Sequence, residues 1–106
     1  MANRLKTMLS KQKTEAPVEK YCVTSVQKRG GLCLKLAIIG KRNFPDRTIL
    51  CKPGKVFFIE FKAPNKDLRK SQAWFRRLLL RLGFTVYVAK TKEQVDQILD
   101  KEMEAS

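Results

Sequence analysis

The sequence predicts one α/β domain with the element order α-β-β-β-α-β-α. Two segments, residues 14–31 and 68–83, have helical apolar spacing, and each ends in glycine. Short apolar runs typical of strands lie between and after them. Two such runs, residues 46–51 and 55–62, are separated only by residues 52–54, a Pro-Gly hairpin signal. At 106 residues the chain is long enough for one modest core.

The first helix is expected within residues 14–31. Pro17 is tolerated in its first turn, and the glycine pair at 30–31 ends it. Its apolar stripe consists of Val18, Cys22 and Val26. Glu19 lies in the first turns, one position from that stripe.

The second helix, within residues 68–83, has one apolar face and several arginines on its other faces. The apolar positions are Leu68, Phe75, Leu78, Leu79 and Leu82. The arginines are Arg69, Arg76, Arg77 and Arg81. The third helix is expected at residues 91–103, because Thr91 precedes Gln94 by three positions in a capping-box pattern.

Four strands complete the prediction. Residues 32–39 form a short, mainly apolar strand, and a loop at residues 40–45 follows it. The hairpin runs 46–51 and 55–62 are the second and third strands, and residues 84–89 are the fourth.

The formal net charge of +13, from 23 basic and 10 acidic residues, is the main compositional anomaly and indicates a polyanionic partner. Half of the acids follow Lys92, so the rest of the chain is still more basic. Lysines that only solubilise the protein, or an anionic membrane surface, are the competing interpretations. Residues 1–13 are read as a basic arm and residues 14–106 as the domain. No apolar run is long enough to span a membrane.

Histidine is absent, and the three cysteines (Cys22, Cys33 and Cys51) lie far apart. A zinc site would need about four nitrogen or sulfur ligands, so the cysteines are expected to be reduced thiols of an intracellular protein. Catalysis through imidazole is excluded. Any catalysis must depend on carboxylates, lysine and a metal ion.

Residues 55–62 place an acid and a base together on one side of a strand. Side chains alternate along a strand, so Phe58, Glu60 and Lys62 share one face. The opposite face is strongly apolar. An ion pair at a strand end is the plain interpretation of this pattern.

The hairpin loop decides which residue faces Glu60. A three-residue loop with Gly54 in the left-handed conformation pairs Cys51 with Lys55 and brings Asp46 opposite Glu60. A two-residue loop would instead bring Asp46 opposite Phe61. Two carboxylates at cross-strand distance repel unless a positive group lies between them. Lysine is one candidate and a divalent cation is another; oxygen ligands favour magnesium or manganese.

Pro45-Asp46, followed after the hairpin by Glu60-Phe61-Lys62, is similar to the PD-(D/E)xK signature of metal-dependent nucleases. The context also agrees: Glu19 on the preceding helix, "FIEFKAP", and Ser71-Gln72 on the next helix. The chain resembles the VRR-NUC family over roughly residues 15–100, in particular its compact stand-alone phage members. The resemblance implies a restriction-endonuclease-like core, with a central mixed sheet flanked by helices.

The resemblance also implies a role for each site residue. Asp46, Glu60 and the backbone carbonyl of Phe61 would hold Mg²⁺, with Mn²⁺ as a substitute. Lys62 would orient and help to deprotonate the attacking water. Glu19 would complete the site through a water or a contact to Lys62, and Gln72 would bind a water or a phosphate. The expected activity is endonucleolytic cleavage of DNA, on branched substrates such as Holliday junctions, by a homodimer.

Basic residues near this site are expected to contact phosphates without reading sequence. They are Lys41, Arg42, Arg69, Lys70, Arg76 and Arg77. The alternative function is a non-catalytic, basic nucleic-acid-binding protein, which explains the charge equally well. It does not explain two carboxylates turned toward the basic surface. The expected location is the cytoplasm of a bacterial or phage-infected cell.

Overall fold

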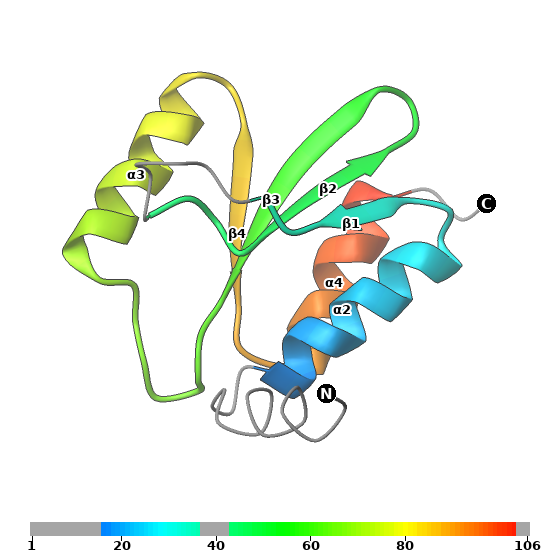
Figure 1. The fold of residues 1–106 in the computed structure, drawn as a ribbon, viewed down its shortest axis with the longest axis horizontal. Coiled ribbons are helices and arrows are strands. Elements are labelled where there is room, and N and C mark those ends of the chain that lie inside the picture. The colour runs from blue at the N-terminus through cyan, green and yellow to red at the C-terminus, as the bar shows by residue number, and fades with distance from the viewer. Residues whose placement is uncertain (1–15, 37–42, 104–106) are drawn as a thin grey trace, which may run out of the picture.

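The computed structural model describes residues 16–36 and 43–103, which form a four-stranded sheet with helices on both faces (Figure 1). The elements are α2 (Ala16–Lys28), β1 (Leu32–Leu34), β2 (Arg47–Cys51), β3 (Lys55–Phe61), α3 (Lys70–Arg81), β4 (Thr85–Ala89) and α4 (Lys92–Glu102). The predicted order and the mixed sheet are therefore confirmed. The basic arm predicted for residues 1–13 lies outside the described residues.

The strand order in the sheet is β1-β2-β3-β4. Strands β1, β2 and β3 are antiparallel neighbours, whereas β4 runs parallel to β3. A parallel neighbour requires a crossover connection, and α3 provides it. Figure 1 shows α3 on one side of the sheet and α2 with α4 on the other.

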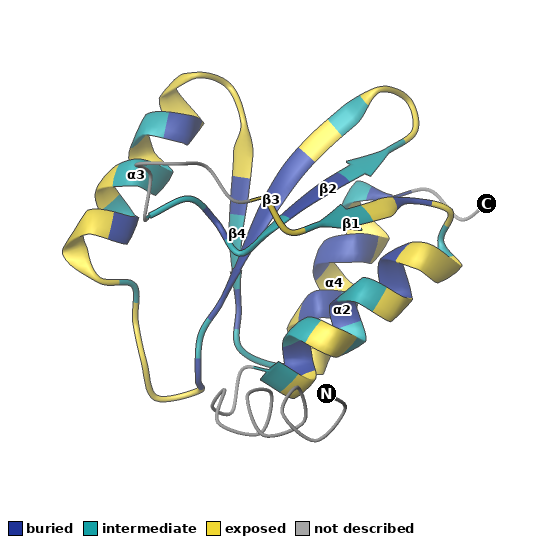
Figure 2. Cartoon of the chain, viewed as in Figure 1, coloured by how far each residue is buried: buried dark blue, intermediate teal, exposed yellow. Residues whose placement is uncertain are grey.

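The sheet face under α2 and α4 carries the main core. Phe57, Ile59 and Phe61 alternate along β3 toward these helices and are almost completely buried. Figure 2 shows most of β3 coloured as buried. The stripe predicted on the first helix, Val18, Cys22 and Val26, is buried against them. On the opposite face Phe58 packs with Leu79 and Val86 in a smaller cluster.

The hairpin has the predicted three-residue loop. Cys51 pairs with Lys55, and the register continues from there to Arg47 opposite Ile59. Gly54 has a φ of 61°, a left-handed conformation that side chains with a Cβ disfavour. One step beyond Arg47 this register brings Asp46 beside Glu60, so the local prediction holds.

Several boundaries differ from the sequence prediction. The first strand ends at Leu34 rather than at residue 39, and residues 37–42 are outside the described part. Helix α3 begins at Lys70, so Leu68 precedes it. Helix α4 begins as predicted, with the Thr91 hydroxyl accepting from Gln94 N at 3.1 Å. Among the helices that the structure describes, none has the length and apolar character to cross a membrane.

Candidate metal and nucleic-acid site

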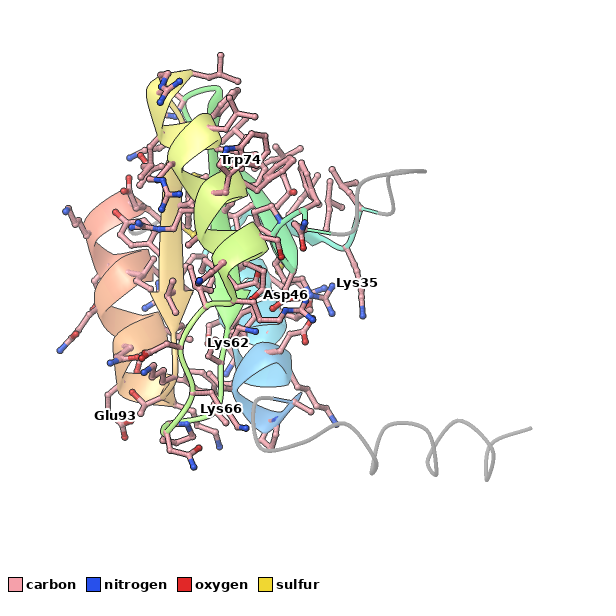
Figure 3. The ribbon with its side chains drawn as sticks, turned by 90° about the vertical axis from the view of Figure 1, so that its left-hand side faces the viewer. Lys35, Asp46, Lys62, Lys66, Trp74 and Glu93 are labelled. Atoms are coloured by element: carbon pink, nitrogen blue, oxygen red, sulfur yellow. The ribbon has the colours of Figure 1, made fainter. Side chains whose placement is uncertain are left out.

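Asp46 and Glu60 come together where β2 begins, on the sheet face that also carries α3. Glu60 is only 5% exposed. The Asp46 carboxylate accepts a hydrogen bond from Phe61 N at 2.8 Å, in the gap where the β2–β3 ladder stops. This bond turns the Asp46 side chain toward the end of β3, where Glu60 lies. Figure 3 shows Asp46 and Lys62 at this end of the sheet, near the start of α3.

The electrostatics of the pair are unfavourable without a cation. Burial raises the pKa of the Glu60 carboxyl well above its usual range, and the adjacent Asp46 raises it further through a hydrogen bond and its charge. The charges of Lys62 and Arg69 act in the opposite direction but do not cancel the shift. The ionised form of Glu60 is therefore disfavoured unless positive charge is added between the two carboxyl groups.

The backbone carbonyl of Phe61 faces the same gap. The N–H of Lys62 donates to Ala89 O in β4, so the N–H and C=O of Phe61, one residue earlier, point toward β2. Continuing the register brings Pro45 opposite Phe61. Proline has no N–H to donate, so the ladder supplies no partner for the Phe61 carbonyl at this point. Two carboxylates and this carbonyl form a set of hard oxygen donors.

Lys62 follows the last residue of β3 and is half-buried. Its charge acts on Glu60, as does that of Arg69 at the start of α3. The predicted proximity of Glu60 and Lys62 is therefore present in the structure. Both cations lie within electrostatic range of the buried Glu60 carboxyl.

Glu19 has a partner that the sequence analysis did not identify. Arg47 Nε donates to Glu19 Oε2 at 2.7 Å, and the two side chains are 19% and 15% exposed. Within residues 16–36 and 43–103, no group of three or more His, Cys, Asp and Glu side chains is placed to hold a metal ion. Asp46 and Glu60 are thus a pair rather than part of a carboxylate triad with Glu19. Strand alternation turns Arg47 toward α2, but the residue that it meets there depends on how the helix packs.

Gln72, in the first turn of α3, is buried, at 8% exposure. Its side-chain oxygen accepts from Arg69 N at 3.0 Å, which satisfies one of the free amides at the start of α3. The oxygen therefore has a structural role, and the side-chain NH₂ is the group left to contact a ligand.

The residues predicted to contact phosphates differ in exposure and in their partners. Arg69, Lys70 and Arg77 are exposed on or just before α3. Arg76 is half-buried, and its Nε donates to Val86 O at 3.2 Å, so it closes the outer edge of β4. Lys41 and Arg42 lie outside the described residues. Cys22, Cys33 and Cys51 form no disulfide in the structure.

The fold and the carboxyl pair define a class: an α/β protein with a restriction-endonuclease-like core. A solved structure described as a VRR_NUC domain matches it with a TM-score of 0.78 and 27% identity, covering 83% of this chain and 96% of that chain. A protein named "Putative nuclease p44", from Acyrthosiphon pisum secondary endosymbiont phage 1, is 34% identical over 79 residues, 74% of this chain and 85% of the relative. No protein-family model matches. The chain belongs to the VRR-NUC family.

Proposed function

We propose that the protein is a Mg²⁺-dependent endonuclease of the PD-(D/E)xK type that hydrolyses phosphodiester bonds in DNA. The observation that carries this proposal is the pairing of buried Glu60 with half-buried Asp46, with Lys62 beside them, in a chain of net charge +13. Two carboxylates on a basic surface weaken phosphate binding unless a cation screens them. The relative named as a nuclease and the VRR_NUC fold support the same conclusion.

The donor set fits a hard divalent cation. Asp46, Glu60 and the Phe61 carbonyl would hold Mg²⁺, or Mn²⁺ in its place, because all three supply oxygen. Positive charge between the carboxyl groups would also favour the ionised form of Glu60, whose pKa is raised by burial and by Asp46. When bound, the cation supplies Lewis-acid chemistry, which offsets the negative charge that builds on the phosphate during hydrolysis.

The side chains around the pair would place the reactants. Lys62 would orient the attacking water and assist the removal of its proton. The water oxygen then bonds to phosphorus as the bond from phosphorus to the 3′ oxygen breaks, which leaves 5′-phosphate and 3′-hydroxyl ends. The NH₂ group of Gln72 would donate to a phosphate oxygen, and Glu19 would support the site through its ion pair with Arg47.

DNA would approach along the first turns of α3. Arg69, Lys70 and Arg77 are exposed there, and phosphate contacts from such residues position a duplex without reading bases. Lys41 and Arg42 are proposed as further contacts. This mode of binding favours selection by shape, which supports branched DNA such as a four-way junction as the substrate.

The first test is cleavage of a synthetic four-way junction beside a linear duplex of the same sequence. We expect Mg²⁺ to be required and the junction to be cut preferentially, with paired nicks in opposing strands. Lys62→Met should lower the cleavage rate by about 100-fold or more while junction binding persists, because proton transfer and orientation are lost. Lys66→Met, at an exposed lysine in the following loop, is the matched control. Cleavage in EDTA would contradict the proposal; binding without cleavage in any metal would favour a binding protein.

A homodimer is the proposed working form, because two symmetric nicks need two sites related by a twofold axis. An apolar surface supports this proposal. Helix α3 covers only part of its sheet face, and large apolar side chains remain exposed on α3 and beside it. They include Trp74, Leu80, Leu82 and Phe84 on or just after α3, and Leu32 and Val56 on the same face of β1 and β3.

Leu82→Glu tests this surface. Leu82 is 65% exposed, so the change should not disturb the core, but a charge there should oppose association. We expect light scattering to give twice the 12.3 kDa chain mass for the parent protein and the single mass for the variant. Gln97→Glu adds the same charge on α4, across the sheet, and should stay dimeric. A parent protein that is monomeric at micromolar concentration would refute the dimer.

A further inference from the structure

The ion pair between Arg47 and Glu19 joins the start of β2 to α2 beside the proposed site. The distance from Arg47 Nε to Glu19 Oε2 is 2.7 Å, and both side chains are more than four-fifths buried. A charged pair with so little exposure is weakly screened by water and salt. Removal of either partner leaves an uncompensated charge, so the contact constrains both elements strongly.

The pair lies on the opposite side of β2 from the carboxylate next to it. Arg47 is paired with Ile59, which is fully buried, and points with it toward α2. Asp46, the preceding residue, points to the other face and accepts from Phe61 N. Asp46 and Arg47 are joined by one planar peptide bond. A displacement of Arg47 therefore also moves the Asp46 carboxylate.

Asp46 is therefore held from two directions. Its own side chain is tethered to β3 by the 2.8 Å bond to Phe61 N, and the next residue is tethered to α2 by the 2.7 Å bond to Glu19. Strand β2 begins only at Arg47, so no earlier ladder pair assists. A site that must hold a cation within a few tenths of an ångström needs such supporting contacts.

We propose that Arg47 is a positioning residue, and that Glu19 acts on the site by anchoring Arg47 rather than as a third metal ligand. This inference rests on the proposed function. It agrees with the observation that, in the described ranges, Glu19 forms no three-membered ligand group with Asp46 and Glu60. The pair is neutral overall, so it can stand beside a DNA-binding surface without repelling phosphates.

The decisive experiment exchanges the two charges. Arg47→Glu and Glu19→Arg are each expected to lower kcat on the four-way junction at least tenfold, with little change in KM, because DNA binding does not depend on the pair. The double variant R47E/E19R restores the ion pair with the two charges exchanged. Its kcat should be at least tenfold higher than that of either single variant. Glu19→Gln keeps an oxygen that Arg47 can reach and should lose less activity than Arg47→Met.

Calorimetric titration with Mg²⁺ alone gives a readout that is independent of turnover. Arg47→Met should weaken Mg²⁺ binding at least fivefold, and Arg47→Lys, which keeps the charge, should weaken it less. If Glu19 is a direct ligand, Glu19→Gln will lose as much Mg²⁺ affinity as Asp46→Asn and the exchanged pair will not recover, which overturns the inference alone. A parent protein that neither binds Mg²⁺ nor cleaves DNA overturns the proposed function as well. Thermal unfolding identifies any variant that fails to fold. If Arg47→Met fails to fold, the Mg²⁺ affinity of Arg47→Lys tests the inference in its place.

Discussion

Replacing Asp46 by asparagine is expected to abolish Mg²⁺-dependent cleavage, by about 10³-fold or more, while the metal-free protein becomes at least as stable as the parent. Cleavage is lost because a neutral amide is a poor ligand for a hard cation. Stability is kept because the asparagine side-chain oxygen can still accept from Phe61 N, and it rises because Asp46 no longer raises the pKa of the buried Glu60. Opposite effects on activity and stability are typical of functional sites.

The measurement pairs single-turnover cleavage of the junction with urea unfolding in EDTA. Asp67→Asn is the matched control, since the Asp67 side chain is 96% exposed and contacts only Lys90 among the described residues. The control should leave both quantities close to those of the parent. An Asp46→Asn protein that still cleaves at one-tenth of the parent rate would show that the carboxylate holds no essential cation.

The second large expected effect is that the free energy of unfolding of the metal-free protein depends on pH, and that Mg²⁺ opposes this dependence. Burial, and then Asp46, raise the pKa of Glu60 above its ordinary value of 4.5. Above pH 4.5 the unfolded chain releases this proton while the folded protein keeps it, so the folded state binds more protons. The free energy of unfolding of the metal-free protein should therefore fall as pH rises, and level off once the folded pKa is passed. For one carboxyl group, the free energy of unfolding falls by at most about 1.4 kcal/mol per pH unit.

Mg²⁺ should oppose this loss, because it binds the ionised carboxyl pair and so binds better at higher pH. We expect the rise in melting temperature on adding Mg²⁺ to be several degrees larger at pH 8.5 than at pH 5.5. Glu60→Gln should flatten the pH profile and remove the Mg²⁺ effect, whereas Glu93→Gln, at an exposed position on α4, should change neither. If Glu60→Gln retains the slope of the parent, the buried carboxyl is not its source.

Much of the candidate site could be predicted because it depends on local geometry. The three-residue loop ending in Gly54 sets the register of the hairpin, and alternation then brings Asp46 and Glu60 together. No long-range information is needed for this step. The apolar stripe on α2 and the cap of α4 were predictable for the same reason, since each follows from spacing within a few residues.

The partners of Glu19 and Arg76 could not be found in this way. Glu19 meets Arg47, 28 residues later, only because α2 packs under the start of β2. Arg76 donates from its Nε to the carbonyl of Val86 at the sheet edge, because the crossover places α3 against β4. The oxygen of Gln72 accepts from Arg69 N, a contact between residues three apart that a pattern at the helix start could have indicated.

The sequence by itself determined the order of the elements, the hairpin register and the closeness of two acids to one lysine, because turns and strand alternation act over a few residues. Only the tertiary structure decided how deeply Glu60 is buried, and hence the direction of its pKa shift. It also decided that Glu19 is bound to Arg47 and that the α3 side of the sheet keeps an exposed apolar surface. Burial and long-range pairing depend on how helices pack across the sheet, which no local pattern specifies.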